Sequence, residues 1–389
     1  MRILVLCYEY PPLGGGGGRV AQSIALQMAA RGHEVRVQTA ALGWHSTIEE
    51  HDGVAVHRTA SGRRAPDTCS VPEMALYCAT SFLPTLRHIR EWKPDVIHAH
   101  FAVPTGGLAW AVHRLTGVPY VLTAHLGDVP GGVPDQTDTL FQLIAPVARQ
   151  IWNHAAAATA VSSFVQELAV AAYHRPVTRI LNGIDLTDTP PPPAAIRHTR
   201  HLVFVGRFNP QKNLPLLIDA LARLTETNWR ATIVGDGPDR ATVEALIDQH
   251  DQRDRITLPG WQSTAQVAAI LNDADILCMP SASEGMPVAA VEALKHGLAI
   301  VTSEIPGVRD VVEHGVNGYR LRLDDSYAHK LSWLLESDET LQAMKHASWE
   351  KARAFDITAI ADQYEAVLRE ATVTRNRPPA AASGSPHPR

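Results

Sequence analysis

Arg207 and Lys212 are two cations five residues apart, and both follow the apolar run 201–205. Because that run is predicted to be a buried strand, both side chains are expected in the loop at its carboxyl end. A guanidinium binds phosphate oxygens through two forked hydrogen bonds, and an ammonium binds them as a point charge. The pair therefore fits a diphosphate, although two solvated loop charges would show the same spacing.

Two carboxylates, Glu284 and Glu292, are separated by seven residues around the predicted start of a helix. Between them, Gly285, Met286 and Pro287 leave backbone N–H groups off the helix N-terminus, where the helix dipole stabilises an anion. Carboxylates accept strong, directional hydrogen bonds from hydroxyl groups. The segment indicates a phosphate site beside sugar hydroxyls, with a dipole partner and an ordinary surface glutamate as the alternative.

Five consecutive glycines, Gly14 to Gly18, follow the first predicted strand and lead into a helix. Backbone amides without side chains can approach a phosphate closely in such a turn. The spacing fails the dinucleotide fingerprint G-x-G-x-x-G, because the third glycine would fall at Arg19 or Val20. The run indicates an anion-binding turn, with a flexible surface turn as the alternative.

Alternating strands and helices place all three groups at strand ends. In the first half, strands are expected at 3–6, 34–39, 95–98, 119–123 and 158–161, with helices at 20–31 and 107–115. In the second half, strands are expected at 201–205, 231–234, 256–258 and 276–279, with helices at 214–224, 239–249, 263–272 and 287–296. Short connections in this pattern require right-handed crossovers and parallel sheets. The sequence therefore predicts an α/β chain of two Rossmann-like, doubly wound domains facing a central cleft.

The composition fits an enzyme that acts on small molecules. The 389 residues are enough for two domains, and 45% hydrophobic with 19% charged residues excludes disordered, collagen-like and polytopic membrane chains. A formal charge of -5 without a dominant patch argues against nucleic-acid binding. The four cysteines contain no CxxC pair, which argues against structural zinc. With no leader-like start and no apolar stretch of about 18 residues, a cytoplasmic location and no transmembrane segment are expected.

Taken together, these features resemble the retaining nucleotide-sugar glycosyltransferases of family 4, which have the GT-B fold. Glu284 to Glu292 is similar to the family's E-x7-E signature, and Gly206-Arg207 with Lys212 is similar to its G-R-x4-K diphosphate element. Three further segments resemble family elements: 10–15, 181–185 and 234–238. The likeness runs in the expected order from about residue 1 to about residue 370.

The resemblance implies a role for each matching residue in binding a nucleotide-sugar donor. Arg207 and Lys212 would hold the diphosphate and stabilise the leaving group as its charge grows. Glu284 would bind hydroxyls of the transferred sugar, and Glu292 would bind the ribose. The remaining donor contacts are expected from the 285–287 backbone, from Gly14, Gly15 and Gly16 closing over the diphosphate, and from Gly235, Gly260 and Trp261 around the base.

His125 is the fourth expected catalytic residue, since it follows a predicted strand and family members often place a histidine there, near sugar and acceptor. Asp128 and His100 are weaker candidates for contact with the acceptor. Each of the three could instead be a hydrogen-bonded loop residue. His98 and His100 flank a strand end but lack the further ligands of a metal site.

The resemblance also implies transfer with retention, with no cofactor and no metal requirement, the nucleotide sugar being a substrate. No D-x-D element stands where a metal-dependent transferase would need it. In the favoured family mechanism, the departing phosphate oxygen takes the acceptor proton on the same face. A UDP-sugar is the expected donor, and the acceptor is an unidentified hydroxyl in the biosynthesis of a glycan or glycoconjugate, on a glycan, a lipid-linked or a small molecule.

Four prolines at 190–193 mark a boundary between the halves, because they favour an extended, semi-stiff connector. We expect a first domain at 1–186, a Pro-rich hinge at 187–199 and a second domain at 200–355. The resemblance implies that the first domain binds the acceptor and the second the donor. A C-terminal helix at 356–374 is expected to pack back on the first domain, followed by a disordered tail at 375–389.

Several alternatives remain beside this interpretation. One is another GT-B enzyme of nucleotide sugars, such as an epimerase or a phosphorylase. Another is a nicotinamide oxidoreductase, and a third is a catalytically silent sugar-binding subunit. Arg63-Arg64 and the basic stretch 87–93 are interpreted as solvated charges, with weak peripheral association with an anionic membrane surface or a phosphorylated acceptor as the alternative.

Overall fold

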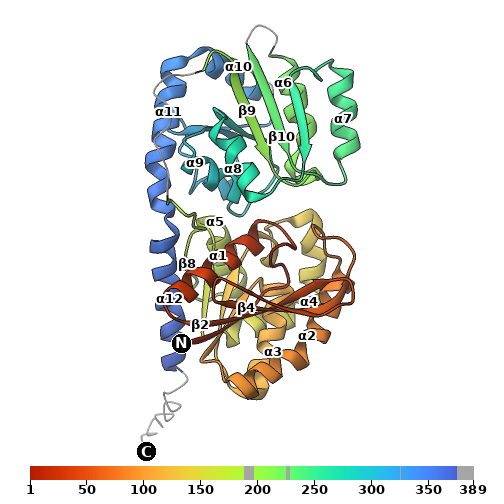
Figure 1. The fold of residues 1–389 in the computed structure, drawn as a ribbon, viewed down its shortest axis with the longest axis vertical. Coiled ribbons are helices and arrows are strands. Elements are labelled where there is room, and N and C mark those ends of the chain that lie inside the picture. Colours follow the sequence, from red (N-terminus) through yellow and green to blue (C-terminus); the bar gives the residue numbers. More distant parts are fainter. Residues whose placement is uncertain (188–196, 225–227, 325, 375–389) are drawn as a thin grey trace, which may run out of the picture.

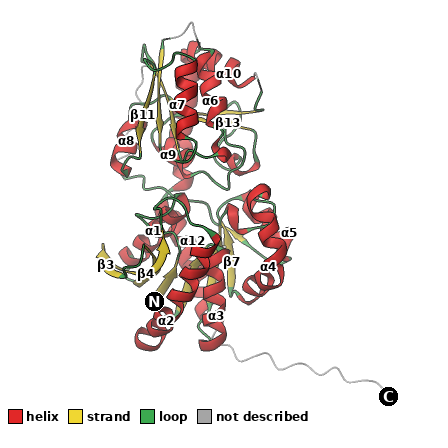
Figure 2. Ribbon diagram, turned by 90° about the vertical axis from the view of Figure 1, so that its right-hand side faces the viewer, coloured by secondary structure: helices red, strands yellow, loops and turns green. Residues whose placement is uncertain are grey.

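The computed structural model describes residues 1–187, 197–224, 228–324 and 326–374 (Figure 1). Most of the expected hinge at 187–199, and all of the expected tail at 375–389, lie outside the described residues. The described chain forms two α/β halves, one above the other in Figure 1, each with its own sheet. In Figure 2, helices lie on both sides of the strands in each half.

The first half contains an eight-stranded sheet, counting the described strands, in the order β3-β4-β2-β1-β5-β6-β7-β8. Its apolar central strand β1 is buried almost throughout, as expected for a strand covered on both faces. The strands are β1 (Arg2–Leu6), β2 (Glu34–Leu42), β3 (Thr47–His51), β4 (Val54–Arg63), β5 (Val96–His100), β6 (Tyr120–Ala124), β7 (Ala157–Ala160) and β8 (Thr178–Arg179).

One edge of this sheet differs from the expected all-parallel arrangement. Strands β3 and β4 pair antiparallel, whereas every other neighbouring pair is parallel among the described strands. The sequence showed no signal for β3 because its residues Thr47–His51 are mostly exposed and polar. A strand at a sheet edge with little burial needs no apolar pattern.

Helices α1 (Gly16–Ala30), α2 (Val71–Trp92), α3 (Gly107–Thr116), α4 (Pro134–His154) and α5 (Ser163–Tyr173) flank the first sheet. Val20, Ile24 and Met28 of α1 are buried, as their spacing of four residues predicts. Helices α2, α4 and α5 were not expected from the sequence. For two of them, α2 and α4, the reason is local. Each contains an internal proline, Pro84 or Pro146, a residue that normally interrupts a helical pattern.

The second half contains a six-stranded parallel sheet within the described chain, in the order β11-β10-β9-β12-β13-β14. Its strands are β9 (Arg200–Val205), β10 (Trp229–Val234), β11 (Ile256–Gly260), β12 (Ile276–Met279), β13 (Ala299–Ser303) and β14 (Gly318–Leu321). Its helices are α6 (Leu214–Ala222), α7 (Arg240–Gln249), α8 (Thr264–Asn272), α9 (Val288–Lys295), α10 (Ser326–Glu336) and α11 (Asp338–Lys351). The expected fold class, two doubly wound α/β halves, is confirmed.

The last helix, α12 (Ile357–Thr374), returns to the first half, and α11 and α12 run along one side of both halves in Figure 1. Helix α12 packs beside α1 and the strands β5 and β6. His33 Nε2 lies 3.0 Å from Glu365 Oε1, and Arg31 contacts Asp362 at the same distance. The C-terminal segment therefore forms part of the first half's structure.

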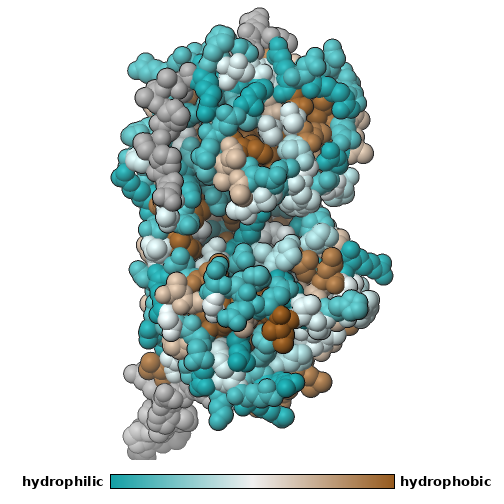
Figure 3. Space-filling view, in the orientation of Figure 1, coloured by the Kyte–Doolittle hydropathy of each residue, from teal (hydrophilic) through white to brown (hydrophobic). Residues whose placement is uncertain are grey.

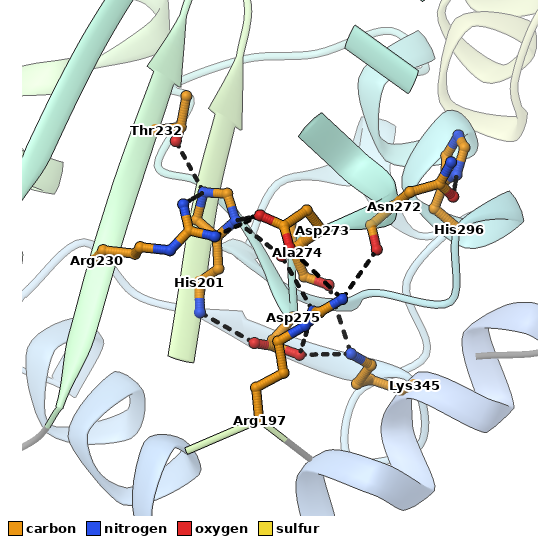
Figure 4. A network of polar contacts seen from close by, with 10 residues as sticks. All are labelled: Arg197, His201, Arg230, Thr232, Asn272, Asp273, Ala274, Asp275, His296 and Lys345. Carbon is orange, nitrogen blue, oxygen red and sulfur yellow. Dashed lines mark hydrogen bonds and ion pairs between the residues drawn. The ribbon is translucent and has the colours of Figure 1, made fainter. Parts of the chain in front are cut away.

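A cluster of charged residues lies around the starts of β9 and β12 (Figure 4). Asp275, just before β12, is buried and lies 2.6 Å from the Nζ of Lys345 on α11. Its other carboxylate oxygen accepts a hydrogen bond from the amide of His201 at 3.0 Å. Arg197, the first described residue after the proline run, lies 3.5 Å from the same carboxylate. Asp275 thus joins α11, β9 and the start of the second half.

The face of the molecule drawn in Figure 3 is mainly hydrophilic, with scattered apolar groups. None of the helices in the described part of the chain has the length and apolar character needed to cross a membrane.

Candidate active site

A cavity of about 360 Å³ lies between the two halves and is lined by residues of both. The glycine loop follows β1, Phe101 follows β5 and His125 follows β6. From the second half, Arg207 follows β9 and Glu284 follows β12. All of these residues stand just beyond the carboxyl ends of parallel strands, the edge at which doubly wound sheets bind ligands.

Lys212 and Glu284 lie side by side in this cavity, with 2.5 Å between Nζ and Oε1. Lys212 ends the short 3₁₀ turn Pro210–Lys212, which the side chain of Asn209 caps by accepting the Lys212 amide at 3.2 Å. Gln211 Nε2 donates to the Ser283 carbonyl at 2.7 Å. The loops after β9 and β12 are therefore bound to each other at two adjacent positions.

Arg207 faces the opposite half of the molecule. A Cβ placed on Gly15 would lie 3.7 Å from an Arg207 terminal nitrogen. The Nε of Arg207 is buried, and none of the described residues accepts a hydrogen bond from it. The guanidinium of the second half and the glycine loop of the first thus border the same space, which suits an anion held from both sides.

Glu292 lies in the second turn of α9, which begins at Val288, and it also lines the cavity. Burial raises the pKa of its carboxyl, while Lys295 and Arg19 lower that pKa. Arg19 belongs to α1 of the first half and lines the same cavity. Between the two glutamates, Gly285, Met286 and Pro287 line the cavity directly before the first turn of α9.

The glycine loop is held in place by residues that sequence reasoning did not single out. Gly14 has a φ of +85°, and a Cβ there would lie 2.5 Å from the Cβ of Glu9. The Glu9 carboxylate accepts a hydrogen bond from the Gly15 amide at 3.3 Å, and the Pro66 carbonyl accepts one from the Gly14 amide at 2.7 Å. Glycine is the residue that adopts this backbone conformation without a steric penalty.

Arg63 departs from the expectation of a solvated or membrane-facing charge. Its side chain is buried, and its guanidinium donates to the carbonyls of Tyr8, Ala65 and Pro66. Because Pro66 also binds Gly14, the Arg63 side chain supports the loop that carries the glycines. The hydrogen bond to Tyr8 joins Arg63, at the end of β4, to the loop after β1. Because the two segments are far apart in sequence, no local pattern predicts the contact.

Of the three residues expected around the base, two line the cavity and one does not. Gly235 and Trp261 line the cavity, and half of the Trp261 surface is exposed. Gly260 does not line the cavity, and its carbonyl accepts the Gly235 amide at 3.0 Å. Gly260 therefore supports the loop that carries Gly235 without itself facing the cavity.

The three acceptor-side candidates also differ in position. His125 lines the cavity, and burial lowers the pKa of its imidazole to about 4. His100 is buried outside the cavity lining, and neither of its ring nitrogens has a hydrogen-bond partner among the described residues. Asp128 is likewise buried and outside the lining, and its carboxylate accepts the His125 amide at 2.7 Å. The placement of Asp128 differs from that of a group facing an acceptor hydroxyl.

Two further cavity residues, Asn182 and Ser281, were not identified as site residues from the sequence. Asn182 is buried, and its Nδ2 donates to the Met286 carbonyl at 3.1 Å, across the boundary between the halves. The Asn182 Oδ1 and the Ser281 Oγ are buried without a described partner. The segment 181–185 signalled the position of Asn182 but not its contact. No three His, Cys, Asp or Glu side chains gather as metal ligands in the described parts of the chain.

Comparison with protein families gives two adjoining matches. Residues 14–188 match the model described as Glycosyltransferase Family 4, and residues 192–351 match the model described as Glycosyl transferases group 1. A glycogen synthase of Mycobacterium tuberculosis is 30% identical over 349 residues, covering 82% of this chain and 81% of that protein. The chain belongs to glycosyltransferase family 4. The expected resemblance to this family is thereby confirmed.

Solved structures show the same architecture. Sucrose-phosphate synthase from Thermosynechococcus elongatus superposes with a TM-score of 0.83 at 19% identity, over 96% of this chain and 99% of that chain. The Anabaena protein HepE, in complex with UDP and glucose, gives a TM-score of 0.75 at 20% identity, over 95% and 99% of the two chains. The fold is GT-B, as expected.

Family membership makes this protein a glycosyltransferase (EC 2.4) that moves a sugar from a nucleotide-sugar donor. That assignment argues against the alternative of a nicotinamide oxidoreductase. The glycine run, whose spacing already failed the dinucleotide fingerprint, belongs instead to the cavity between the halves.

Proposed function

We propose that this glycosyltransferase moves a hexosyl group from a UDP-sugar to an acceptor hydroxyl, with retention of configuration and without a metal ion. The observation that carries the proposal is the pairing of Lys212 with Glu284 beside Arg207 in the cavity between the halves. Two cations suited to a diphosphate thus adjoin a carboxylate suited to sugar hydroxyls. In a nucleotide diphosphate sugar, the diphosphate is bonded directly to the sugar, so the two kinds of ligand group are also neighbours.

We assign each part of the donor to a group of residues that line the cavity. The diphosphate lies between Arg207, Lys212 and the glycine loop, with the 285–287 backbone near the sugar. Glu284 binds hydroxyls of the sugar, and Glu292 binds those of the ribose. The base lies toward Gly235 and Trp261. This assignment is supported by the fact that all of these residues line one cavity of about 360 Å³.

In the proposed reaction, the bond between the anomeric carbon and the phosphate oxygen breaks as the acceptor oxygen bonds to the same face of that carbon. The acceptor proton passes to the departing phosphate oxygen, so no side chain serves as a base. Arg207 and Lys212 bear the negative charge that grows on the diphosphate. His125, neutral at physiological pH because burial lowers its pKa to about 4, contributes hydrogen bonds rather than charge.

The choice of uridine rests on similarity alone. HepE, which shares the fold, was solved with UDP and glucose, and also with UDP-glucose. The expected domain roles are part of the same proposal: residues 1–186 recognise the acceptor, residues 200–355 hold the donor, and the connection between them permits closure around both.

The experiment is a thermal-shift titration of the purified protein with UDP, GDP, ADP and NAD, each with and without EDTA. A ligand at a hundred times its dissociation constant stabilises the folded state by about 2.7 kcal/mol. We expect UDP to raise the Tm equally with and without EDTA, and Arg207→Ala to abolish the shift. Arg253→Ala, an exposed arginine paired with Asp248 outside the cavity, is the matched control. Stabilisation only by another nucleotide, or only in the absence of EDTA, would contradict the proposal.

A further inference from the structure

Phe101 has an unusual backbone conformation at the edge of the cavity. Its φ is +71° and its ψ is 115°, a combination that residues with a side chain rarely adopt. Its amide donates to the Thr123 carbonyl at 3.0 Å, and its carbonyl accepts the Gly106 amide at 2.9 Å. Glycine would adopt this conformation more easily. A phenylalanine at a position that favours glycine indicates that its ring has a role in this structure.

The ring of Phe101 contacts the two parts of the first half that face the donor. It stacks on His125, with ring centroids 4.4 Å apart and an angle of 28° between the planes. A Cβ added to Gly17 would lie 2.6 Å from the Phe101 Cζ, so the glycine loop passes directly against the ring. Tyr8 packs edge-on against Phe101 at 5.0 Å.

The stacking on Phe101 restrains the plane of the His125 ring, while the turn that His125 caps restrains its other edge. Its Nε2 is buried and has no hydrogen-bond partner in the described residues. An imidazole without a polar partner at that nitrogen is restrained on that side by packing, and stacked aromatic rings favour a defined plane.

Asp128 fixes the backbones that carry the two rings. Its carboxylate accepts a hydrogen bond from the His125 amide at 2.7 Å. Burial raises the pKa of Asp128 to about 8, and the hydrogen bonds from the amides of His125, Ala102 and Val103 partly oppose that rise. The side chain is buried among these groups. Asp128 thus joins the segment after β5 to the segment after β6.

We propose that Phe101 is a positioning residue that sets the plane of His125 and supports the glycine loop, with Asp128 holding the two backbones in register. The inference rests on the proposed function, because it requires His125 to contact the donor sugar. Phe101 has no polar group to offer the substrate. Phe101 therefore acts on the sugar through His125. In a variant that already lacks the His125 imidazole, replacing Phe101 should not weaken sugar binding further.

The test measures the dissociation constants of UDP and UDP-glucose by calorimetry. Since the two ligands share the nucleotide, the ratio of their dissociation constants isolates binding of the sugar, and changes in phosphate contacts cancel. We expect Phe101→Leu and His125→Ala to shift this ratio in the same direction, by about fivefold for the loss of one well-placed hydrogen bond. The double variant should show no larger shift than His125→Ala alone, because residues acting through one contact are not additive.

Three further variants separate positioning from general destabilisation. Phe141→Leu makes the same change at a buried phenylalanine of α4 outside the cavity lining, and should lower the Tm while leaving the ratio unchanged. Phe101→Tyr keeps the stacked ring and should keep the wild-type ratio. Phe101→Gly removes the ring but suits the backbone, and serves if Phe101→Leu does not fold.

The possible failures can be told apart. A normal ratio in Phe101→Leu, together with a shifted ratio in His125→Ala, would overturn the inference and leave the role of His125 intact. An unshifted ratio in His125→Ala would overturn both. If the wild-type chain does not bind UDP, the donor proposal fails, and the His125 imidazole resonance in NMR still decides about Phe101. A resonance unmoved by Phe101→Leu would contradict the stacking.

Discussion

The Nζ of Lys212 lies 2.5 Å from the Oε1 of Glu284, and this ion pair joins the loop after β9 to the loop after β12. The ammonium has three N–H donors, of which one serves Glu284, and the carboxylate keeps its second oxygen for other partners. Each group is therefore held by the other while retaining capacity for the donor. The pair fixes the distance between the proposed phosphate site and the proposed sugar site.

Replacing Lys212 with methionine should reduce turnover far more than it reduces stability. The change removes a cation that bears leaving-group charge, and loss of one such contact costs about 100-fold to 1,000-fold in kcat. The measurement is the initial rate of UDP release from UDP-glucose, with and without candidate acceptors. Lys330→Met, at a lysine of α10 that packs over the Tyr319 ring outside the cavity, is the control. A loss below tenfold would count against the role of Lys212.

Acidification should destabilise the first half through its buried histidines. Burial lowers the pKa of His98 to about 3, below the ordinary value that it has in the unfolded chain. The unfolded state therefore binds the proton first, and stability is complete above about pH 6.5 and lost as the pH falls. Each such group contributes up to about 1.4 kcal/mol per pH unit.

His98→Gln should flatten this acid limb relative to the wild-type chain, as measured by urea unfolding between pH 4.5 and 7. Asp128 acts with the opposite sign, because burial raises its pKa to about 8, so the comparison is between variants at equal pH. Parallel curves for His98→Gln and wild type would contradict the prediction, because they would show that His98 has the same pKa in the folded and the unfolded protein.

Lys345→Met should cost more stability than Arg197→Met, although both residues contact Asp275 (Figure 4). The Lys345 side chain is 4% exposed and that of Arg197 is 36% exposed. Breaking a buried pair leaves an uncompensated charge and costs about 3–5 kcal/mol. Water reaches the Arg197 side chain and screens its attraction to Asp275, so the loss of Arg197 should cost less. Urea unfolding measures both. Equal losses would mean that Arg197 shares the charge of Asp275 equally.

Asp310→Ala should loosen the contact between the two halves. Asp310 of the second half accepts the Ser163 amide and hydroxyl of α5, each at 2.7 Å, and lies 3.2 Å from Arg179 on β8. We expect a larger radius of gyration by small-angle X-ray scattering and a raised KM for the donor, with little change in Tm. Asp324→Ala, at an exposed carboxylate beside Arg322, is the control. An unchanged radius would show that other contacts hold the halves together.

Much of the fold could be predicted because its signals are local. The apolar run of β1, the four-residue spacing of Val20, Ile24 and Met28, and the proline before α9 each follow from covalent geometry and burial over a few residues. The exposed hairpin strand β3 and the proline-containing helices α2 and α4 could not. Their stability comes from neighbours elsewhere in the chain, which override local preference.

The sequence by itself determined which chemical groups are available: two cations spaced for a diphosphate, two carboxylates around a helix start, and a glycine run, each at the end of a predicted strand. Only the tertiary structure decided how they meet. It paired Lys212 with Glu284, brought Arg207 near Gly15, and buried Asp128 beside the backbone of His125 instead of exposing it to an acceptor. Contacts between residues distant in sequence depend on how strand ends from both sheets converge, and short-range periodicity carries no record of that convergence.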